Sequence, residues 1–233
     1  MRANLIAALD IGTTKTCAVI GELTGDLPRR PQLKVLGVGQ ARTSGMRREV
    51  VTHIEETTES ILKAMKEAEL MAGATVDRVY AGIAGEHIAA FSSVGVVAVG
   101  GEEVTVPDLD RVHEVARAVA LPPARELLHA IPQEYRVDHQ GGIKDPVGMA
   151  GTRLEAEVYL VTCSSASATN IRKAVSRAGY RIQELVLEPL ASSQAVLTED
   201  EKEVGVAMVE MGGGTTDIAV FYEGKIRHLA VLP

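Results

Sequence analysis

The sequence ALDIGTTKTCAVIG, residues 8–21, places an acid, a glycine turn and hydroxyl groups between two runs of strand-forming residues. The sequence VEMGGGTTDIAVFY, residues 209–222, repeats that order. Glycines at such turns admit positive φ and close approach of a ligand, and successive backbone N–H groups form a concavity that binds anions. Threonine hydroxyls add donors, and an acid before the turn suits a divalent cation carried by the anion. We therefore expect two facing hairpins that hold a metal-bound polyphosphate from both sides.

Either turn alone is more often a structural turn than a phosphate site, so the pairing carries the prediction. Neither stretch has the GxxxxGK[ST] string of a Walker loop, and neither is a GxGxxG fingerprint that opens a helix. The context here is strand, turn, strand. One acid, a glycine turn and hydroxyls recurring in the same order at opposite ends of the chain favour a phosphate site.

These residues also carry a resemblance. DIGTTKT, residues 10–16, resembles the first phosphate loop of the actin, Hsp70 and sugar-kinase superfamily, and MGGGTTDIAV, residues 211–220, resembles its second. LEPLASSQAVL, residues 187–197, resembles the strand-to-helix connection between those loops. The stretches between them, above all residues 42–73 and 129–163, resemble the FtsA family of bacterial cell-division proteins over essentially the whole chain. The resemblance implies an α/β protein with an actin-like, ribonuclease H-like ATPase domain.

The resemblance also implies ATP and Mg²⁺ as cofactors. Asp10 matches the acid that holds magnesium through water, and Lys15 is placed as a point charge against phosphate oxygens, although a lone lysine is usually only a solvated charge. Asp217 is expected to fix the second hairpin rather than to touch the ligand. The two phosphate cradles are expected at Gly12, Thr13 and Thr14, and at Gly212, Gly213, Gly214, Thr215 and Thr216.

Two further acids are candidate catalytic residues. Glu188, before Pro189, matches the position near the attacking water, and we expect it to orient that water; a helix N-terminal acid favoured by the dipole is the structural alternative. Glu210 is a second candidate metal-holding acid, but it stands where the family has Asp. The extra methylene moves the carboxylate by about 1.5 Å. Because misplacement near 1 Å can cost about a hundredfold in rate, nucleotide binding is expected to survive better than hydrolysis.

Hydrophobic period and turn residues predict the elements between the two turns. After a strand over 33–38, residues 39–48 are expected to form a polar loop, and a helical stripe follows over 51–72. Thr52 with Glu55 predicts a capping box for this helix, and Gly73 its end. A buried strand is expected over 76–83.

From about residue 84 the pattern changes to that of a compact βαββ insertion. Strands are predicted over 94–99, 127–137 and 154–162, with a helix over 107–120 capped by Thr105. A helix over 167–178 and a strand over 182–187 follow. In the terms of the resembling family, we expect subdomain 1A over 1–83 and 164–187, subdomain 1C over 84–163, and the start of subdomain 2A over 188–233.

Composition limits the classes of partner. The chain has 233 residues, 46% of them hydrophobic, and a net charge of −7 with scattered basic residues, which disfavours nucleic acid and anionic membrane surfaces. Its first residues lack the pattern of a signal peptide, and no apolar run approaches the about 18 residues of a membrane span. Cys17 and Cys163 are expected to be buried thiols in a reducing compartment, which favours a cytoplasmic location.

The resemblance implies an ATP-binding cell-division protein with at most weak ATPase activity. Such a protein self-associates into filaments, links FtsZ to the cytoplasmic face of the membrane, and recruits later division proteins, partly through 1C. The FtsZ contact and the membrane-binding helix are expected outside these residues, so the chain is interpreted as an N-terminal fragment. A PilM-like pilus assembly protein and a small-molecule kinase of the same superfamily are the alternatives. Phosphate transfer to a small molecule would indicate the kinase, but the sequence shows no substrate-binding acid cluster.

Overall fold

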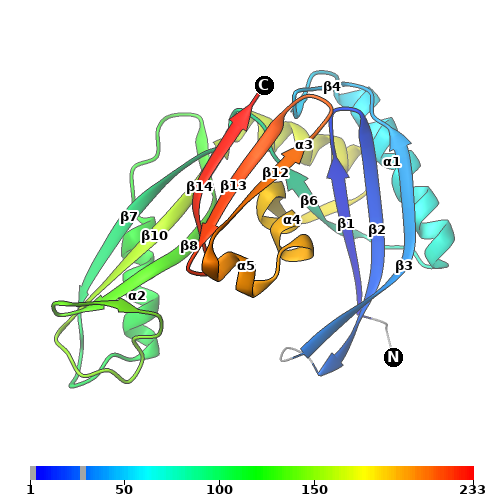
Figure 1. Cartoon of the computed structure of the whole chain (residues 1–233). Helices are drawn as coiled ribbons and strands as arrows, with labels where there is room; N and C mark the ends of the chain where they lie inside the picture. Colours follow the sequence, from blue (N-terminus) through cyan, green and yellow to red (C-terminus); the bar gives the residue numbers. More distant parts are fainter. Residues whose placement is uncertain (1–3, 27–29) are drawn as a thin grey trace. The chain divides into compact units, whose positions relative to one another are not determined.

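The computed structural model describes residues 4–26 and 30–233 (Figure 1). It divides into two compact units, a first unit made of Met1–His87 with Ser164–Pro233 and a second unit of Ile88–Cys163. Across the described residues, no helix combines the length and the apolar character needed to cross a bilayer.

A five-stranded sheet forms the base of the first unit, in the order β11-β6-β1-β2-β3. Strands β1, β2 and β3 form an antiparallel meander, while β6 and β11 run parallel to β1 (Figure 1). The bounds are Leu5–Ile11 for β1, Lys15–Asp26 for β2, Arg30–Arg42 for β3, Arg78–Ile83 for β6 and Arg181–Leu187 for β11. The sheet therefore carries the first glycine turn at the end of β1 and beginning of β2.

The predicted polar loop over 39–48 is wrong. Strand β3 continues to Arg42, and a short hairpin of β4 (Met46–Arg47) and β5 (Val50–Val51) follows. Gly37 and Gly39 keep β3 extended here because helix α1 (Ile54–Ala72) lies directly on them: a Cβ on Gly39 would stand 1.9 Å from the Ala64 carbonyl oxygen. Close helix–strand contact, rather than a loop, explains those glycines.

Helix α1 packs its stripe of Ile61, Met65 and Ala68 into the core, as the hydrophobic period predicts. Its end at Gly73, in the left-handed conformation with φ 64°, is also confirmed. The predicted Thr52–Glu55 capping box is wrong. His53 is the N-cap, and its ring nitrogen Nδ1 accepts a long hydrogen bond of 3.5 Å from the Glu56 N–H.

The second half of the first unit adds three helices and a smaller sheet. Helix α3 (Ser165–Arg177) starts two residues before the predicted position, and Gly179, with φ 93°, follows it. Helix α4 (Glu188–Val196) begins where β11 ends, as expected for the strand-to-helix connection, and α5 (Glu199–Val204) follows. The antiparallel strands β12 (Val206–Met211), β13 (Thr216–Tyr222) and β14 (Lys225–Leu232) then carry the second glycine turn.

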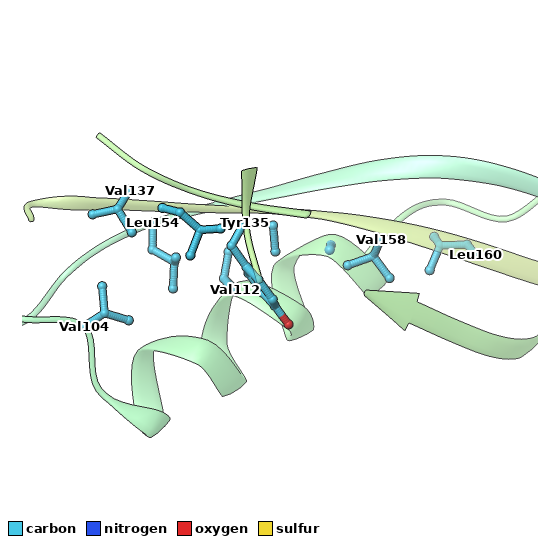
Figure 2. Close-up of a cluster of buried hydrophobic side chains, with 10 residues drawn as sticks. Val104, Val112, Tyr135, Val137, Leu154, Val158 and Leu160 are labelled. Carbon is cyan, nitrogen blue, oxygen red and sulfur yellow. The ribbon is translucent and has the colours of Figure 1, made fainter. Parts of the chain in front are cut away.

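The second unit is a four-stranded sheet in the order β7-β10-β8-β9 with one helix. Its elements are β7 (Ala89–Ala98), α2 (Val106–Arg117), β8 (Arg125–Val137), β9 (Gln140–Ile143) and β10 (Arg153–Ser164). Figure 2 shows the core between helix and sheet, where Val112, Leu154 and Val158 are buried. The prediction of Thr105 as the N-cap of α2 is confirmed, and its N–H donates to Asp108 Oδ2 at 2.9 Å. The βαββ prediction omitted β9, which pairs with β8.

Candidate functional site

The two glycine turns are structural copies of each other. In the first hairpin Asp10 pairs with Cys17, and in the second Glu210 pairs with Asp217. One backbone hydrogen bond closes each turn: Gly12 N–H donates to the Lys15 carbonyl at 3.0 Å, and the equivalent bond from Gly212 spans 2.9 Å. The repeat seen in the sequence is therefore a repeat of backbone geometry and register.

The turns face each other at van der Waals contact. A Cβ on Gly213 would lie 2.4 Å from Thr14 Cγ2, and one on Gly214 would lie 2.7 Å from Thr13 Oγ1. None of these turn glycines has positive φ, so that part of the expectation is wrong. They are needed because two backbones approach closely, and the threonines of one turn occupy the space that the glycines of the other leave.

A cavity of about 240 Å³ lies at the two turns. This volume is below the ~300–1,000 Å³ of sites that enclose a whole small molecule, and it suits the phosphate part of a nucleotide. Gly214 and Thr216 do not line it, whereas Asp217 does. Asp217 also accepts from Thr215 Oγ1 at 3.2 Å, as expected for a residue that fixes the hairpin. The lining residues are Asp10, Gly12, Thr13, Thr14, Lys15, Glu49, Glu188, Glu210, Met211, Gly212, Gly213, Thr215 and Asp217.

Glu49 is a polar lining residue that the sequence prediction missed, and Met211 is an apolar one. Glu49 sits in the loop of the β4–β5 hairpin, and its carboxylate accepts a hydrogen bond of 3.0 Å from Thr13 Oγ1. Two-residue hairpin loops are usually signalled by Asn-Gly or Asp-Gly, whereas this loop is Arg48-Glu49 between very short strands. Its sequence therefore gave no sign of a hairpin or of a contact with the first turn.

Five carboxyl groups in this cavity have a raised pKa. Burial is the main cause for each of them, and repulsion from neighbouring acids raises the pKa of Glu49, Glu188 and Glu210 further. The pKa of Glu188 is raised most, because it is deeply buried and faces acids from both turns. Among the described lining residues Lys15 alone is basic, and it partly offsets the shift of the Asp10 pKa. The site therefore favours an anion only if cations come with it. The five groups are Asp10, Glu49, Glu188, Glu210 and Asp217.

The donors fit a magnesium ion that arrives on a polyphosphate. Within the part of the chain described, no three His, Cys, Asp or Glu side chains are close enough to hold a metal ion by themselves. Mg²⁺ usually keeps several waters and uses one or two carboxylates together with substrate phosphates. Asp10 and Glu210, which the two turns bring to the same cavity, are such a pair.

Glu188 stands between this cavity and an apolar neighbour of about 370 Å³, because it lines both. Its carboxylate lies over Gly82, where a Cβ would stand 2.5 Å from Glu188 Oε1. Cys17 also lines the apolar cavity and is only half-buried, so its predicted burial is wrong, while Cys163 is buried as expected. Glu188 is therefore a desolvated carboxyl group shared by the cavity at the two turns and its apolar neighbour.

Solved structures define the class of fold. The chain is similar over its full length to a protein of the PilM–PilN type IV pilus biogenesis complex, with a TM-score of 0.67, 14% identity and 62% of that chain covered. It is also similar to the ethanolamine utilization protein EutJ from Carboxydothermus hydrogenoformans, with a TM-score of 0.52, 16% identity and 53% of that chain covered. The fold is that of the actin-like ATPases.

Sequence comparisons define the family. The family model described as the SHS2 domain inserted in FTSA matches residues 85–162. Cell division protein FtsA from Pseudomonas aeruginosa is 48% identical over 230 residues, and that from Escherichia coli K12 is 42% identical. Each alignment covers 99% of this chain and 54% of the relative. The chain belongs to the FtsA family, and it spans about half the length of these relatives.

Proposed function

We propose that this chain provides the phosphate-binding part of a nucleotide site that takes ATP with Mg²⁺, in a cell-division protein. The observation that carries the proposal is the single cavity lined by two turns of matched register, each with one acid at the same position. The excess of carboxylates over the one lysine supports a metal-bound polyphosphate rather than a free anion.

Each residue then has a defined role. The backbone N–H groups of the two turns donate hydrogen bonds to the phosphate oxygens, and Lys15 neutralises part of the phosphate charge. Asp10 and Glu210 would hold the magnesium ion, which brings the phosphates together and neutralises them. Glu188, buried and facing the cavity, orients a water molecule.

Binding is favoured over hydrolysis at this site. Both carboxylate oxygens of Glu210 lie 3.2 Å from Ser192 Oγ on α4, so this hydroxyl draws the carboxylate toward the helix. Asp10, one methylene shorter, starts from the equivalent position of the first hairpin. The two carboxylates would therefore stand at different distances from a shared metal ion. For this reason we propose that the ATPase activity of the whole protein is weak.

The relatives bear the name cell division protein, and this chain matches about half the length of each. We extend that role to the complete protein. It would self-associate, link FtsZ to the cytoplasmic face of the membrane, and recruit later division proteins, with the second unit as a contact surface. The proposed FtsZ and membrane contacts lie outside these 233 residues. Pull-down of FtsZ by the complete protein tests this role; pilus assembly draws no support from 14% identity.

The site itself is tested by calorimetric titration of Mg-tripolyphosphate and Mg-ATP into the 233-residue chain. Tripolyphosphate is the sharper probe because it needs no adenosine contacts. We expect saturable binding that disappears without Mg²⁺ and weakens in Asp10→Asn. Glu86→Gln, which changes an exposed carboxylate outside the cavity, is the matched control. No heat of binding for either ligand in the presence of Mg²⁺ would overturn the proposal.

A further inference from the structure

The loop of the β4–β5 hairpin has an unfavourable backbone. Arg48 and Glu49 are its two residues, and both are left-handed, with φ 47° and 60°. Hairpin loops with positive φ at both positions favour Asn-Gly, because a Cβ crowds the backbone there. Strain of this kind in residues other than glycine is concentrated at functional sites. The contacts of Glu49 show what this backbone achieves.

Glu49 holds the first phosphate turn through one hydroxyl group. Thr13 Oγ1 donates to Glu49 Oε1 at 3.0 Å, and the Glu49 backbone N–H donates to the same Oγ1 at 3.2 Å. The Thr13 hydroxyl is thus bonded twice to one residue, which fixes its rotamer and ties the turn to the hairpin. The neighbouring Thr14 is exposed, and its hydroxyl makes no hydrogen bond to any described residue.

The environment of Glu49 does not favour a carboxylate for stability. Glu49 is only 8% exposed, and the charges that act on it are those of Asp10 and Asp217, which raise its pKa in addition to burial. The adjacent Arg48 guanidinium instead lies 3.7 Å from Glu86 on the surface. A buried carboxylate among acids costs folding free energy. A carboxylate at this position therefore needs a reason beyond stability.

The same hairpin loop also reaches the second turn. A Cβ on Gly214 would meet both Thr13 Oγ1, at 2.7 Å, and Arg48 Cα, at 3.1 Å. The loop, the first turn and the second turn thus pack on one another at Thr13. Resting on the proposed function, we propose that Glu49 is a positioning residue: it fixes Thr13 and holds the first turn in its phosphate-binding shape before a ligand arrives.

Three substitutions at one position separate hydrogen bonding, charge and strain. Glu49→Ala removes the acceptor and should weaken Mg-tripolyphosphate binding about tenfold, the value of one charge-assisted hydrogen bond. Glu49→Gln keeps an amide oxygen for Thr13, so its affinity should stay within about threefold of the wild type. Glu49→Gly also relieves the left-handed backbone, so it should fold at least as well as the wild type and still bind about tenfold more weakly.

The Thr13 partner provides a second test. Thr13→Val should weaken binding as much as Glu49→Ala, and the double variant should be no weaker than either single variant, because both remove the same bond. Glu86→Gln is again the control for a change of charge near Arg48. Affinity equal to the wild type in both Glu49→Ala and Glu49→Gly would overturn the inference.

Amide hydrogen exchange in the ligand-free chain distinguishes this inference from the proposed function. In Glu49→Ala the Gly12 amide, which donates to the Lys15 carbonyl at 3.0 Å within the first turn, should exchange about tenfold faster, with exchange in β1 unchanged. If the wild-type chain binds no Mg-tripolyphosphate, the proposed function fails and exchange alone decides on Glu49. Unchanged exchange at Gly12 would then overturn the positioning role.

Discussion

The first and second glycine turns have the same backbone geometry, but they differ in nearly every side chain that faces the opposite turn. The first presents Thr13 and Thr14 where the second has Gly213 and Gly214, so the two surfaces interlock. The first also has a lysine, Lys15, where the second has a threonine. The two turns are therefore complementary: the first supplies larger side chains and a positive charge, and the glycines of the second leave room for them.

The acids at the start of the two turns differ in the same manner. Asp10 receives no hydrogen bond from the described side chains, whereas Glu210 is drawn toward α4 by Ser192. The register nevertheless places them at equivalent positions. The comparison indicates that the Glu210 carboxylate is held beside helix α4 by Ser192, whereas the Asp10 carboxylate is not held by a side chain of the described residues.

The largest effect is expected from making the two acids alike. In the complete protein, Glu210→Asp should raise ATP turnover by up to about a hundredfold, because misplacement near 1 Å carries a cost of that size. Affinity for Mg-ATP should change little. Steady-state phosphate release measures the effect. Ser192→Ala, which frees the carboxylate without shortening it, should give only part of the gain, and turnover unchanged in Glu210→Asp would show that the difference in length does not matter.

The interlocking of the turns predicts unequal costs at two adjacent glycines. Gly214→Ala meets Thr13, which Glu49 holds in place, and the Arg48 backbone, so it should lower the free energy of unfolding by about 2 kcal/mol. Gly213→Ala meets only Thr14, which is exposed and can rotate, so its cost should be under about 1 kcal/mol.

Urea denaturation of the ligand-free chain measures both costs. Gly101→Ala is the matched control, because a Cβ there would meet no atom within 4 Å. Equal losses at Gly213 and Gly214 would mean that Thr13 is no more rigid than Thr14, contrary to its two hydrogen bonds.

The difference in charge between the turns rests on one residue. Lys15→Met should weaken binding of Mg-tripolyphosphate about tenfold, since a charge-assisted hydrogen bond to phosphate is lost. The loss should shrink at high salt, which screens an exposed lysine. Titrations at two salt concentrations measure it, with Lys63→Met on the exposed face of α1 as the control. A loss of equal size in both variants would argue against a specific role for Lys15.

The two turns and the end of α1 were predictable from the order of residues along the chain, and the family resemblance added the strand-to-helix connection. The repeated order of acid, glycine and threonine can be recognised without knowing any distant contact, as can Gly73 at a helix end. The prediction failed where distant contacts decide the outcome. Gly39 indicated the start of a loop, yet it is a glycine because α1 lies on it.

Glu49 illustrates the same limit at the site. Its bond to Thr13 joins residues 36 positions apart, and its hairpin lacks the usual glycine, so no local pattern indicates it. The N-cap of α1 shows a smaller limit: Thr52 and His53 are adjacent, and the chain path into the helix selects the histidine. Positions of single side chains thus needed the structure, although the pairing of the turns did not.

Glu188 is the group on which both turns act. Asp10 of the first turn and Glu210 and Asp217 of the second all raise the pKa of Glu188, together with Glu49 and above all burial. An acid with a raised pKa binds more protons in the folded chain than in the unfolded chain. Its ionisation therefore lowers stability as pH rises above its ordinary value of 4.5.

Glu188→Gln removes this penalty, so its stability relative to the wild type should be constant below about pH 4 and grow above it, by at most about 1.4 kcal/mol per pH unit. Urea denaturation of the ligand-free chain over a pH series measures the difference. Glu201→Ala is the control of opposite sign, because hydrogen bonds from Thr198 lower the Glu201 pKa, so its loss should destabilise increasingly as pH rises from the acid range. A pH-independent difference for Glu188→Gln would mean that neither burial nor the acids of the two turns raise the pKa of Glu188.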